Sequence, residues 1–451
     1  MPLRDLIQPI NFISPYEKRG RVVSIMGLMV EVEGLEAWCV VGSRCLLENR
    51  FGKMVEAEVV GFRGYIAQVM PFQSTEGIGP GCAVIYEHSK AQLFPCQAWL
   101  GRVINALGQP IDQKGVLPLG HKGYSLSHKP PPAHSRKLLT ETFEVGVRAI
   151  DLFTTCCKGQ RMGIFAGSGV GKSVLMSMIA RFSKADVIVI GLIGERGREV
   201  QEFIQSYLGD EGLARSVLIV ATSDEAPLMR KQAAYATLTV AEYFADQGME
   251  VLCMMDSVTR FAMSMREIGL SLGEPPASKG YTPTVFAELP RLLERAGPGT
   301  RNRAHITGLF TVLVEGDDHN EPVADAVRGI LDGHIVLERQ IAERGRFPAM
   351  NLLRSVSRTM PDCNAAEHTQ AVSEAKQMFS IYEDMVDMIR LGAYKQGTDP
   401  SVDIVMEKVP AIFDFLNQGK DEKGDVRVDL ANLIQLIGMN HEENLTPANE
   451  A

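Results

Sequence analysis

A glycine-rich stretch at residues 160–174 constrains the fold of this chain more than any other feature. It reads Gln-Arg-Met-Gly-Ile-Phe-Ala-Gly-Ser-Gly-Val-Gly-Lys-Ser-Val. The apolar run at 162–165 predicts a strand, the small residues after it predict a loop, and Lys172 and Ser173 open a helical segment through Arg181. A strand, a loop and a helix in this order form the setting of a phosphate-binding loop, because backbone N–H groups and the helix N-terminus can face phosphate oxygens.

The loop follows the pattern G-x-x-x-x-G-K-[ST] with one departure. Ala166 stands where the first glycine is expected, and alanine needs only a negative φ there. Lys172 is expected to reach the β- and γ-phosphates of a nucleotide, and the Ser173 hydroxyl to bind Mg²⁺. A turn that only joins a strand to a helix would not require lysine and serine at these positions. The predicted nucleotide-binding residues are Gly167, Ser168, Gly169, Val170, Gly171, Lys172, Ser173 and Val174.

Length and composition limit the classes of function. A chain of 451 residues predicts two or three domains, and its net charge of −9 argues against nucleic acid as a partner. No apolar run reaches the ~20 residues of a membrane span, so any membrane contact is expected to be peripheral. The eight cysteines are scattered without a CxxC pair, which predicts reduced thiols and neither disulfides nor a zinc site.

Periodicity divides the chain into four parts. Residues 1–18 carry apolar residues at helical spacing, interrupted by Pro9, and are either a frayed terminus or a docking segment for a partner. Alternating apolar and polar residues with glycine breaks predict a small β-barrel over 19–92. The nucleotide-binding domain is expected over 93–364 and begins with a connector at 93–145. Helical spacing predicts a helical domain over 365–451.

The central domain is expected to be a wound α/β fold. Apolar runs at 187–193, 217–221, 251–255 and 306–314 alternate with segments long enough for helices. This alternation predicts a mostly parallel sheet whose carboxyl ends carry the chemistry.

Two carboxylates follow predicted strands of this sheet. Asp256 ends the run 251–255, where it can hold the Mg²⁺ shell beside Ser173. An aspartate after a strand is by itself more often a turn residue. Glu195 follows the run 187–193 and Gly194, and we predict it to be the base that orients and deprotonates water in front of the γ-phosphate. The alternative for Glu195 is a solvated turn carboxylate.

A positive group outside the loop is also expected. Negative charge spreads over the phosphoryl oxygens during transfer, and an arginine reaching in can add ~10³–10⁵ in rate. Arg358 lies well downstream of the predicted strands, so we expect it to act on the ATP of a neighbouring subunit.

Long motifs give the chain a family resemblance. The segments 163–173, Gly-Glu-Arg-Gly-Arg-Glu (194–199), Met-Asp-Ser-Val-Thr-Arg-Phe-Ala (255–262), Gly-Glu-Pro-Pro-Ala-Ser-Lys-Gly-Tyr (273–281) and Val-Glu-Gly-Asp-Asp (314–318) resemble the flagellar and type III protein-export ATPases. These enzymes are similar to the catalytic subunit of F-type ATP synthase and, more distantly, to the Rho helicase. The resemblance implies an α/β fold with a RecA-like P-loop NTPase core, a small N-terminal β-barrel and a C-terminal helical domain, assembled as a homo-hexamer.

The resemblance also assigns residues. It makes Glu195, Lys172 and Arg358 catalytic, with Arg358 as a trans-acting arginine finger, and it places Ser173 and Asp256 on the metal side. Phe347 matches the aromatic residue that stacks on adenine, where many relatives carry tyrosine. Arg196 and Arg260 match positions that support the site and the subunit contact. Cys156 and Cys157 have no counterpart in the family pattern.

The implied function is Mg²⁺-dependent ATP hydrolysis that energises flagellar protein export. The implied partners are a stator-like regulator at the N-terminal segment, a coiled-coil stalk protein in the ring pore, and the export gate with its chaperones and substrates. The implied location is the cytoplasm, peripheral to the inner membrane at the export apparatus. Short motifs at 56–62, 69–71 and 77–81 favour the flagellar enzyme over the virulence-injectisome ATPase, which is the alternative.

Three other readings fit less well. A non-hydrolysing subunit of a rotary enzyme is expected to lack the carboxylate of Glu195. An RNA translocase of the Rho type is disfavoured by the acidic composition and by the absence of an aromatic and basic N-terminal domain. An ATP synthase catalytic subunit is disfavoured because residues 395–400 lack the acidic cluster that the resemblance implies.

Overall fold

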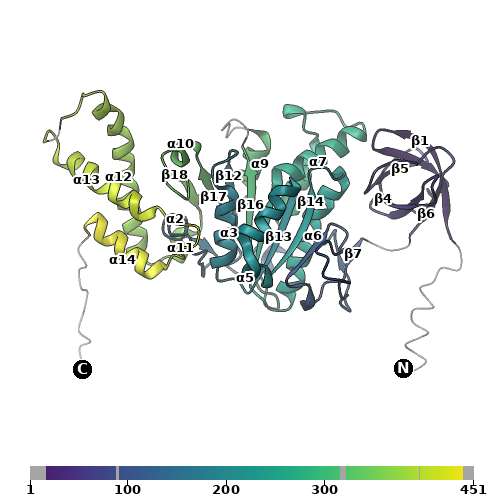
Figure 1. Cartoon of the computed structure of the whole chain (residues 1–451), viewed down its shortest axis with the longest axis horizontal. Coiled ribbons are helices and arrows are strands. Elements are labelled where there is room, and N and C mark those ends of the chain that lie inside the picture. The colour runs from purple at the N-terminus through teal and green to yellow at the C-terminus, as the bar shows by residue number, and fades with distance from the viewer. Residues whose placement is uncertain (1–16, 88–90, 315–320, 396, 440–451) are drawn as a thin grey trace, which may run out of the picture.

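The computed structural model describes residues 17–87, 91–314, 321–395 and 397–439. In this part of the chain a β-barrel, a sheet domain and a group of helices follow one another along the long axis (Figure 1). This arrangement confirms the predicted fold class. The predicted docking segment at 1–18 lies, except for its last two residues, outside the described residues. No described helix has the length and apolar character that crossing a membrane requires.

Six antiparallel strands close the N-terminal barrel in the order β1-β2-β5-β4-β3-β6, as the alternation predicted. Their inward side chains, such as Val30, Val32 and Val59, are fully buried and form a core of their own. The strands are β1 (Arg19–Met26), β2 (Met29–Glu33), β3 (Arg44–Glu48), β4 (Met54–Arg63), β5 (Ile66–Pro71) and β6 (Ala83–Tyr86).

The barrel also contacts the sheet domain directly. Three apolar side chains of the barrel pack into the apolar core of the next domain and not into the barrel core: Met29, Met70 and Phe72. Beside them, the buried Glu58 carboxylate lies 3.2 Å from Nζ of Lys231 on helix α6. Both apolar packing and an ion pair therefore hold the barrel against the sheet domain.

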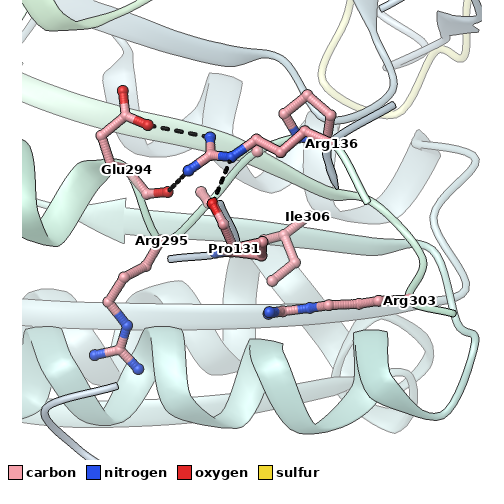
Figure 2. A pocket seen from close by; sticks show the side chains of 9 residues that line it. Pro131, Arg136, Glu294, Arg295, Arg303 and Ile306 are labelled. Carbon is pink, nitrogen blue, oxygen red and sulfur yellow. Dashed lines mark hydrogen bonds and ion pairs between the residues drawn. The ribbon is translucent and has the colours of Figure 1, made fainter. Parts of the chain in front are cut away.

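The connector contributes a strand to the main sheet. Strand β8 (Arg102–Asn105) pairs in parallel with β14 and forms one edge of that sheet. The proline run at 130–132 has no regular structure and leads to Arg136, which donates to the Pro131 carbonyl and to both the carboxylate and the carbonyl of Glu294 (Figure 2). The connector also includes β7 (Gln92–Leu93), η1 (Gln97–Trp99), β9 (Tyr124–Ser125), η2 (Ala133–Ser135), β10 (Thr142–Phe143), α2 (Arg148–Phe153) and β11 (Cys156–Cys157).

Eight strands form the main sheet in the order β18-β17-β12-β16-β15-β13-β14-β8. All neighbours are parallel except β17 and β18, so the predicted mostly parallel sheet is confirmed. Each of the four predicted apolar runs is a strand. The remaining strands are β12 (Arg161–Ala166), β13 (Val187–Glu195), β14 (Ser216–Thr222), β15 (Val251–Asp256), β16 (Ile306–Leu313), β17 (Gly333–Leu337) and β18 (Met350–Ser357).

Two apolar cores cover the two faces of this sheet. Successive strand residues alternate between them: Val187 and Val189 belong to one core, and Ile188 and Ile190 to the other. Helices α6 to α9 pack on the first face, and α2, α3 and the C-terminal helices on the second. The helices are α3 (Lys172–Phe182), α4 (Gly197–Glu202), the π-helical turn η3 (Phe203–Leu208), α5 (Gly209–Ala214), α6 (Pro227–Asp246), α7 (Val258–Ser271), η4 (Ser278–Gly280), α8 (Pro283–Leu293), α9 (Pro322–Ile330), α10 (Arg339–Glu343) and α11 (Met360–Cys363).

Three helices, α12 (Ala366–Arg390), α13 (Pro400–Leu416) and α14 (Val426–Ile437), end the described chain, as the helical spacing predicted. Asp399 caps α13 through its side chain, which accepts from the Ser401 N–H. The buried side chains of these helices, among them Phe379 and Ile412, belong to the same core as β12 and α3. The helical part is thus packed against the side of the sheet that carries the glycine-rich loop.

Candidate active site

The glycine-rich loop runs from the carboxyl end of β12 to the first turn of α3. Ala166 is buried at the end of β12 with an extended backbone, so this position tolerates alanine, as predicted. Gly169 and Gly171 have φ values of 79° and 89°, a left-handed conformation that glycine adopts without strain. Ser168 and Gly169 are exposed, whereas Val170 is buried beneath them.

Lys172 points from the start of α3 toward two strand ends. Its Nζ forms an ion pair with Asp256 Oδ1 and lies 3.9 Å from Glu195 Oε1. Asp256, the last residue of β15, also accepts a hydrogen bond of 2.6 Å from the buried Thr311 hydroxyl on β16. The sheet therefore brings together Lys172 and both predicted carboxylates. Ser173 is adjacent and half-buried on the first turn of α3.

Glu195 ends β13 in an apolar and negatively charged environment. Burial, and after it the Asp256 carboxylate, raises the pKa of Glu195 to about 7, although Lys172 opposes the shift. Oε1 of Glu195 is buried, and no residue in the described part of the chain donates a hydrogen bond to it. A carboxylate with a free lone pair and a pKa near neutrality has the properties of a general base.

The two arginines predicted to support the site differ in their contacts. Arg260 is on α7, and its side chain covers Gly194 so closely that a Cβ atom there would lie 2.9 Å from the Arg260 Cβ. Its Nε is buried and has no hydrogen-bond partner among the described residues. Arg196 is 81% exposed and pairs with Glu199 at 3.5 Å. Arg260 thus packs against the end of β13, whereas Arg196 faces solvent.

Phe347 lies beside the glycine-rich loop. A Cβ atom at Gly171 would be 3.6 Å from Cδ1 of Phe347, and Phe347 as a residue is 43% exposed. The main chain of Phe347 is bonded to the end of α13: its N–H donates to Asn417 Oδ1, and its carbonyl accepts from the Gln418 N–H, both at 2.8 Å. An exposed aromatic face therefore stands next to the predicted phosphate site.

Arg358 is not part of this cluster. It follows β18, the edge strand of the sheet, and its side chain is exposed. Within the described residues, none pairs with its guanidinium; its backbone N–H donates to the Asp332 carbonyl at 3.0 Å. Arg358 is thus available on the surface beside the sheet edge.

All eight cysteines carry free thiols. Cys156 and Cys157 form the short strand β11 and are fully buried, and the Cys157 thiol donates to the Thr359 carbonyl at 3.9 Å. Within the described residues, no group of three or more His, Cys, Asp or Glu side chains could hold a metal ion.

Sequence reasoning missed four residues around the site. Thr311 holds Asp256, Arg339 donates to the Ser168 carbonyl at 3.2 Å, and Asn417 and Gln418 hold Phe347. Thr311 gave one signal, a polar residue inside an apolar strand. The other three gave none, because they come from segments distant in sequence.

Comparison with known families supports this architecture part by part. Residues 22–86 match the beta-barrel domain of the ATP synthase alpha/beta family, and residues 146–357 match its nucleotide-binding domain. Residues 364–435 match the T3SS EscN ATPase C-terminal domain. The chain is thus an ATPase of the ATP synthase alpha/beta family whose C-terminal part resembles that of secretion ATPases.

Full-length relatives narrow the family. The flagellum-specific ATP synthase of Caulobacter vibrioides is 57% identical over 96% of this chain and 99% of its own. The chain belongs to the flagellum-specific ATP synthase family. The Bacillus subtilis member is 47% identical over 97% of this chain and 99% of its own. The predicted membership in the flagellar branch of the family is therefore confirmed.

Solved structures of this wider family have the same fold. The assembled ATPase EscN of the enteropathogenic E. coli type III secretion system is 39% identical, with a TM-score of 0.86 over 93% of this chain and 100% of that one. The structure of EscN in complex with its central stalk EscO is 38% identical to this chain, with a TM-score of 0.85 over 93% of this chain and 100% of that one. The injectisome enzyme is thus less similar in sequence to this chain than the flagellar relatives.

Proposed function

We propose that this family member hydrolyses Mg²⁺-bound ATP in a homo-hexameric ring and thereby energises flagellar type III protein export. The observation that supports this chemistry is that Lys172, Glu195 and Asp256 lie together at the carboxyl ends of the central strands. Oε1 of Glu195 is buried there and accepts no hydrogen bond from the described residues. The flagellar relatives supply the biological setting.

The loop residues fit a triphosphate. Gly167 to Val174 form the cradle, with two glycines in left-handed conformation and Lys172 available to the β- and γ-phosphates. Ser173 and Asp256 offer a hydroxyl and a carboxylate, the oxygen ligands that Mg²⁺ takes when waters and phosphates complete its shell. Bound Mg²⁺ would neutralise charge that develops on the phosphate oxygens.

Glu195 accepts the proton of the attacking water in this proposal. Its Oε1, which accepts no hydrogen bond from the described residues, provides the lone pair, and its pKa of about 7 keeps a substantial fraction ionised in a neutral cell. Arg260 holds the end of β13 against α7, and exposed Arg196 contributes to the contact between subunits. Phe347 stacks on the adenine base.

Arg358 completes the site of the neighbouring subunit. Its guanidinium is exposed beside edge strand β18 and has no partner among the residues that the structure describes, which supports an action outside its own chain. The solved relative EscN is described as assembled and as binding a central stalk, so we extend a ring and a coiled-coil stalk partner to this chain.

The remaining assignments follow from the export role. We propose a cytoplasmic enzyme, peripheral to the inner membrane at the export gate, that releases chaperones and unfolds export substrates. A stator-like regulator binds the N-terminal segment. The proposed domains are a docking segment at 1–18, the barrel at 19–92, the ATPase domain at 93–364 and the helical domain at 365–451.

A mixing experiment tests the shared site. Glu195→Gln chains and Arg358→Ala chains are each expected to be inactive, and their mixture to regain ATPase activity. A working site then has Glu195 from one chain and Arg358 from its neighbour. The matched control mixes Glu195→Gln with Lys172→Ala: both residues act in the same chain, so this mixture must stay inactive. Recovery in the control, or none in the test mixture, would refute the trans assignment of Arg358.

A further inference from the structure

The turn that carries Phe347 is held by the end of helix α13 and not by its own domain alone. Asn417 Oδ1 accepts the Phe347 N–H, and the Gln418 N–H donates to the Phe347 carbonyl, both at 2.8 Å. Both backbone polar groups of Phe347 are therefore paired with two consecutive residues of the helical part. The position of the aromatic ring depends on where residues 417 and 418 lie.

The side chain of Gln418 reaches a third segment. Its Oε1 accepts the Arg148 N–H at 2.8 Å, and its Nε2 donates to the Gly146 carbonyl at 3.0 Å and to the Glu422 carbonyl at 2.7 Å. Gln418 is only 3% exposed. A buried amide with three partners fixes the relative positions of the segments that it joins, because each lost bond would leave a buried polar group unpaired.

Other hydrogen bonds also hold the segment that Gln418 contacts. The buried Asp151 carboxylate accepts the Val145 and Gly146 N–H groups, each at 2.8 Å. Residues 146–148 lead directly into α2, which precedes β12 and the glycine-rich loop. Gln418 thus connects the turn of Phe347, through its backbone N–H, to a fixed point of the nucleotide-binding domain, through its side chain.

We propose that Gln418 is a positioning residue for the adenine base: it sets the distance between the Phe347 ring and the glycine-rich loop. The inference rests on the proposed stacking of Phe347 on adenine. Gln418 does not touch the nucleotide in this proposal. It acts only through Phe347, so it contributes to affinity for the base and not to affinity for the phosphates.

The test compares two ligands of the full-length chain, MgADP and magnesium tripolyphosphate. Gln418→Met removes the three side-chain bonds and keeps the backbone bond to Phe347. It should weaken MgADP binding about tenfold, within the loss expected for a disturbed base stack. Tripolyphosphate binding should not change, and kcat at saturating ATP should stay within about twofold while KM rises. Equal weakening of both ligands would overturn the proposal.

A matched variant controls for stability. Gln160 is also a fully buried glutamine with three side-chain bonds, to the Cys157 N–H, the Ser357 hydroxyl and the Asp332 carbonyl, but it does not contact Phe347. Gln160→Met should lower the thermal midpoint as Gln418→Met does and leave MgADP affinity unchanged. If it weakens MgADP equally, destabilisation explains the effect and the proposal is wrong.

A double-mutant cycle separates this inference from the proposed function. Phe347→Ala should weaken MgADP by itself, and adding Gln418→Met should then have little further effect. If Phe347→Ala leaves MgADP affinity unchanged, the stacking role fails and this inference fails with it. If Phe347→Ala weakens binding and Gln418→Met does not, only the role of Gln418 is wrong. Exposed Asn417→Ala, which removes the bond to the Phe347 N–H without disturbing a core, should act in the same direction as Gln418→Met.

Discussion

Lys172 and Asp256, 84 positions apart in the chain, form an ion pair across the carboxyl ends of strands β12 and β15. The same ammonium group lies 3.9 Å from Glu195. One cation therefore holds two carboxylates that would otherwise repel each other in a buried setting. This arrangement makes the site sensitive to pH and to single substitutions.

Turnover should depend on pH through Glu195. A base must be ionised, and burial raises the pKa of Glu195 to about 7. Because this pKa is that of the nucleotide-free site, we expect kcat/KM for MgATP to be level above pH 8 and to fall about tenfold per pH unit well below pH 7. A kcat/KM that stays constant from pH 5.5 to 8 would contradict the assignment. ADP affinity over the same range reports any loss of folding.

Replacing Glu195 by Gln should separate catalysis from stability. We expect kcat to fall by about 10²–10⁴, the usual contribution of a general base, with ATP binding retained. At pH 8 the thermal midpoint should stay equal or rise, because the amide removes a buried charge whose ionisation folding disfavours. A variant that keeps more than half of its activity would exclude Glu195 as the base.

The hydroxyl of Thr311 should matter for magnesium. Thr311→Val removes the hydrogen bond to Asp256 and should cost about 1–3 kcal/mol of stability, as for a bond to a charged group. The Mg²⁺ concentration for half-maximal ATPase activity should rise. Thr307→Val is the matched control: Thr307 is also buried on β16, and its hydroxyl accepts the Gly159 N–H. It should lose stability without a change in Mg²⁺ requirement.

The buried ion pair between Arg295 and Glu242 should contribute to the stability of the sheet domain. Arg295 and Glu242 pair at 2.8 Å with side chains 1% and 2% exposed. Removing only the arginine, as in Arg295→Ala, should cost about 3–5 kcal/mol because an uncompensated charge stays buried. Arg354→Ala, which breaks the more exposed pair with Glu338, should cost less than about 1 kcal/mol. Thermal unfolding of both variants checks the contrast.

Acid should weaken the same pair. Burial opposes ionisation of Glu242, but the Arg295 guanidinium, with smaller contributions from His128 and Arg303, outweighs it and lowers the pKa of Glu242 to about 2. Because the folded-state pKa is below the unfolded value, the stabilisation is complete above about pH 4.5 and is lost as the pH falls toward 2. Unfolding midpoints between pH 3 and 5 should therefore fall more steeply in the wild type than in a Glu242→Gln, Arg295→Met double variant. Equal slopes would contradict this.

The local patterns of the sequence determined much of this protein. The alternation in the barrel, the apolar runs of the sheet and the order of strand, glycine-rich loop and helix are set by neighbours in the chain, since side-chain period and glycine content decide them. Glu195 and Asp256 were predictable for the same reason, because each ends an apolar run in a parallel sheet.

Tertiary structure alone decided which of these residues meet. The sequence does not encode locally that β15 and β13 lie beside one another, that β8 from the connector completes the sheet edge, or that Thr311 reaches Asp256. The bonds from Asn417 and Gln418 to Phe347 join segments 70 positions apart. Such contacts form because the apolar faces of sheet and helices must be buried together, and that packing fixes the distances between polar groups that no local pattern specifies.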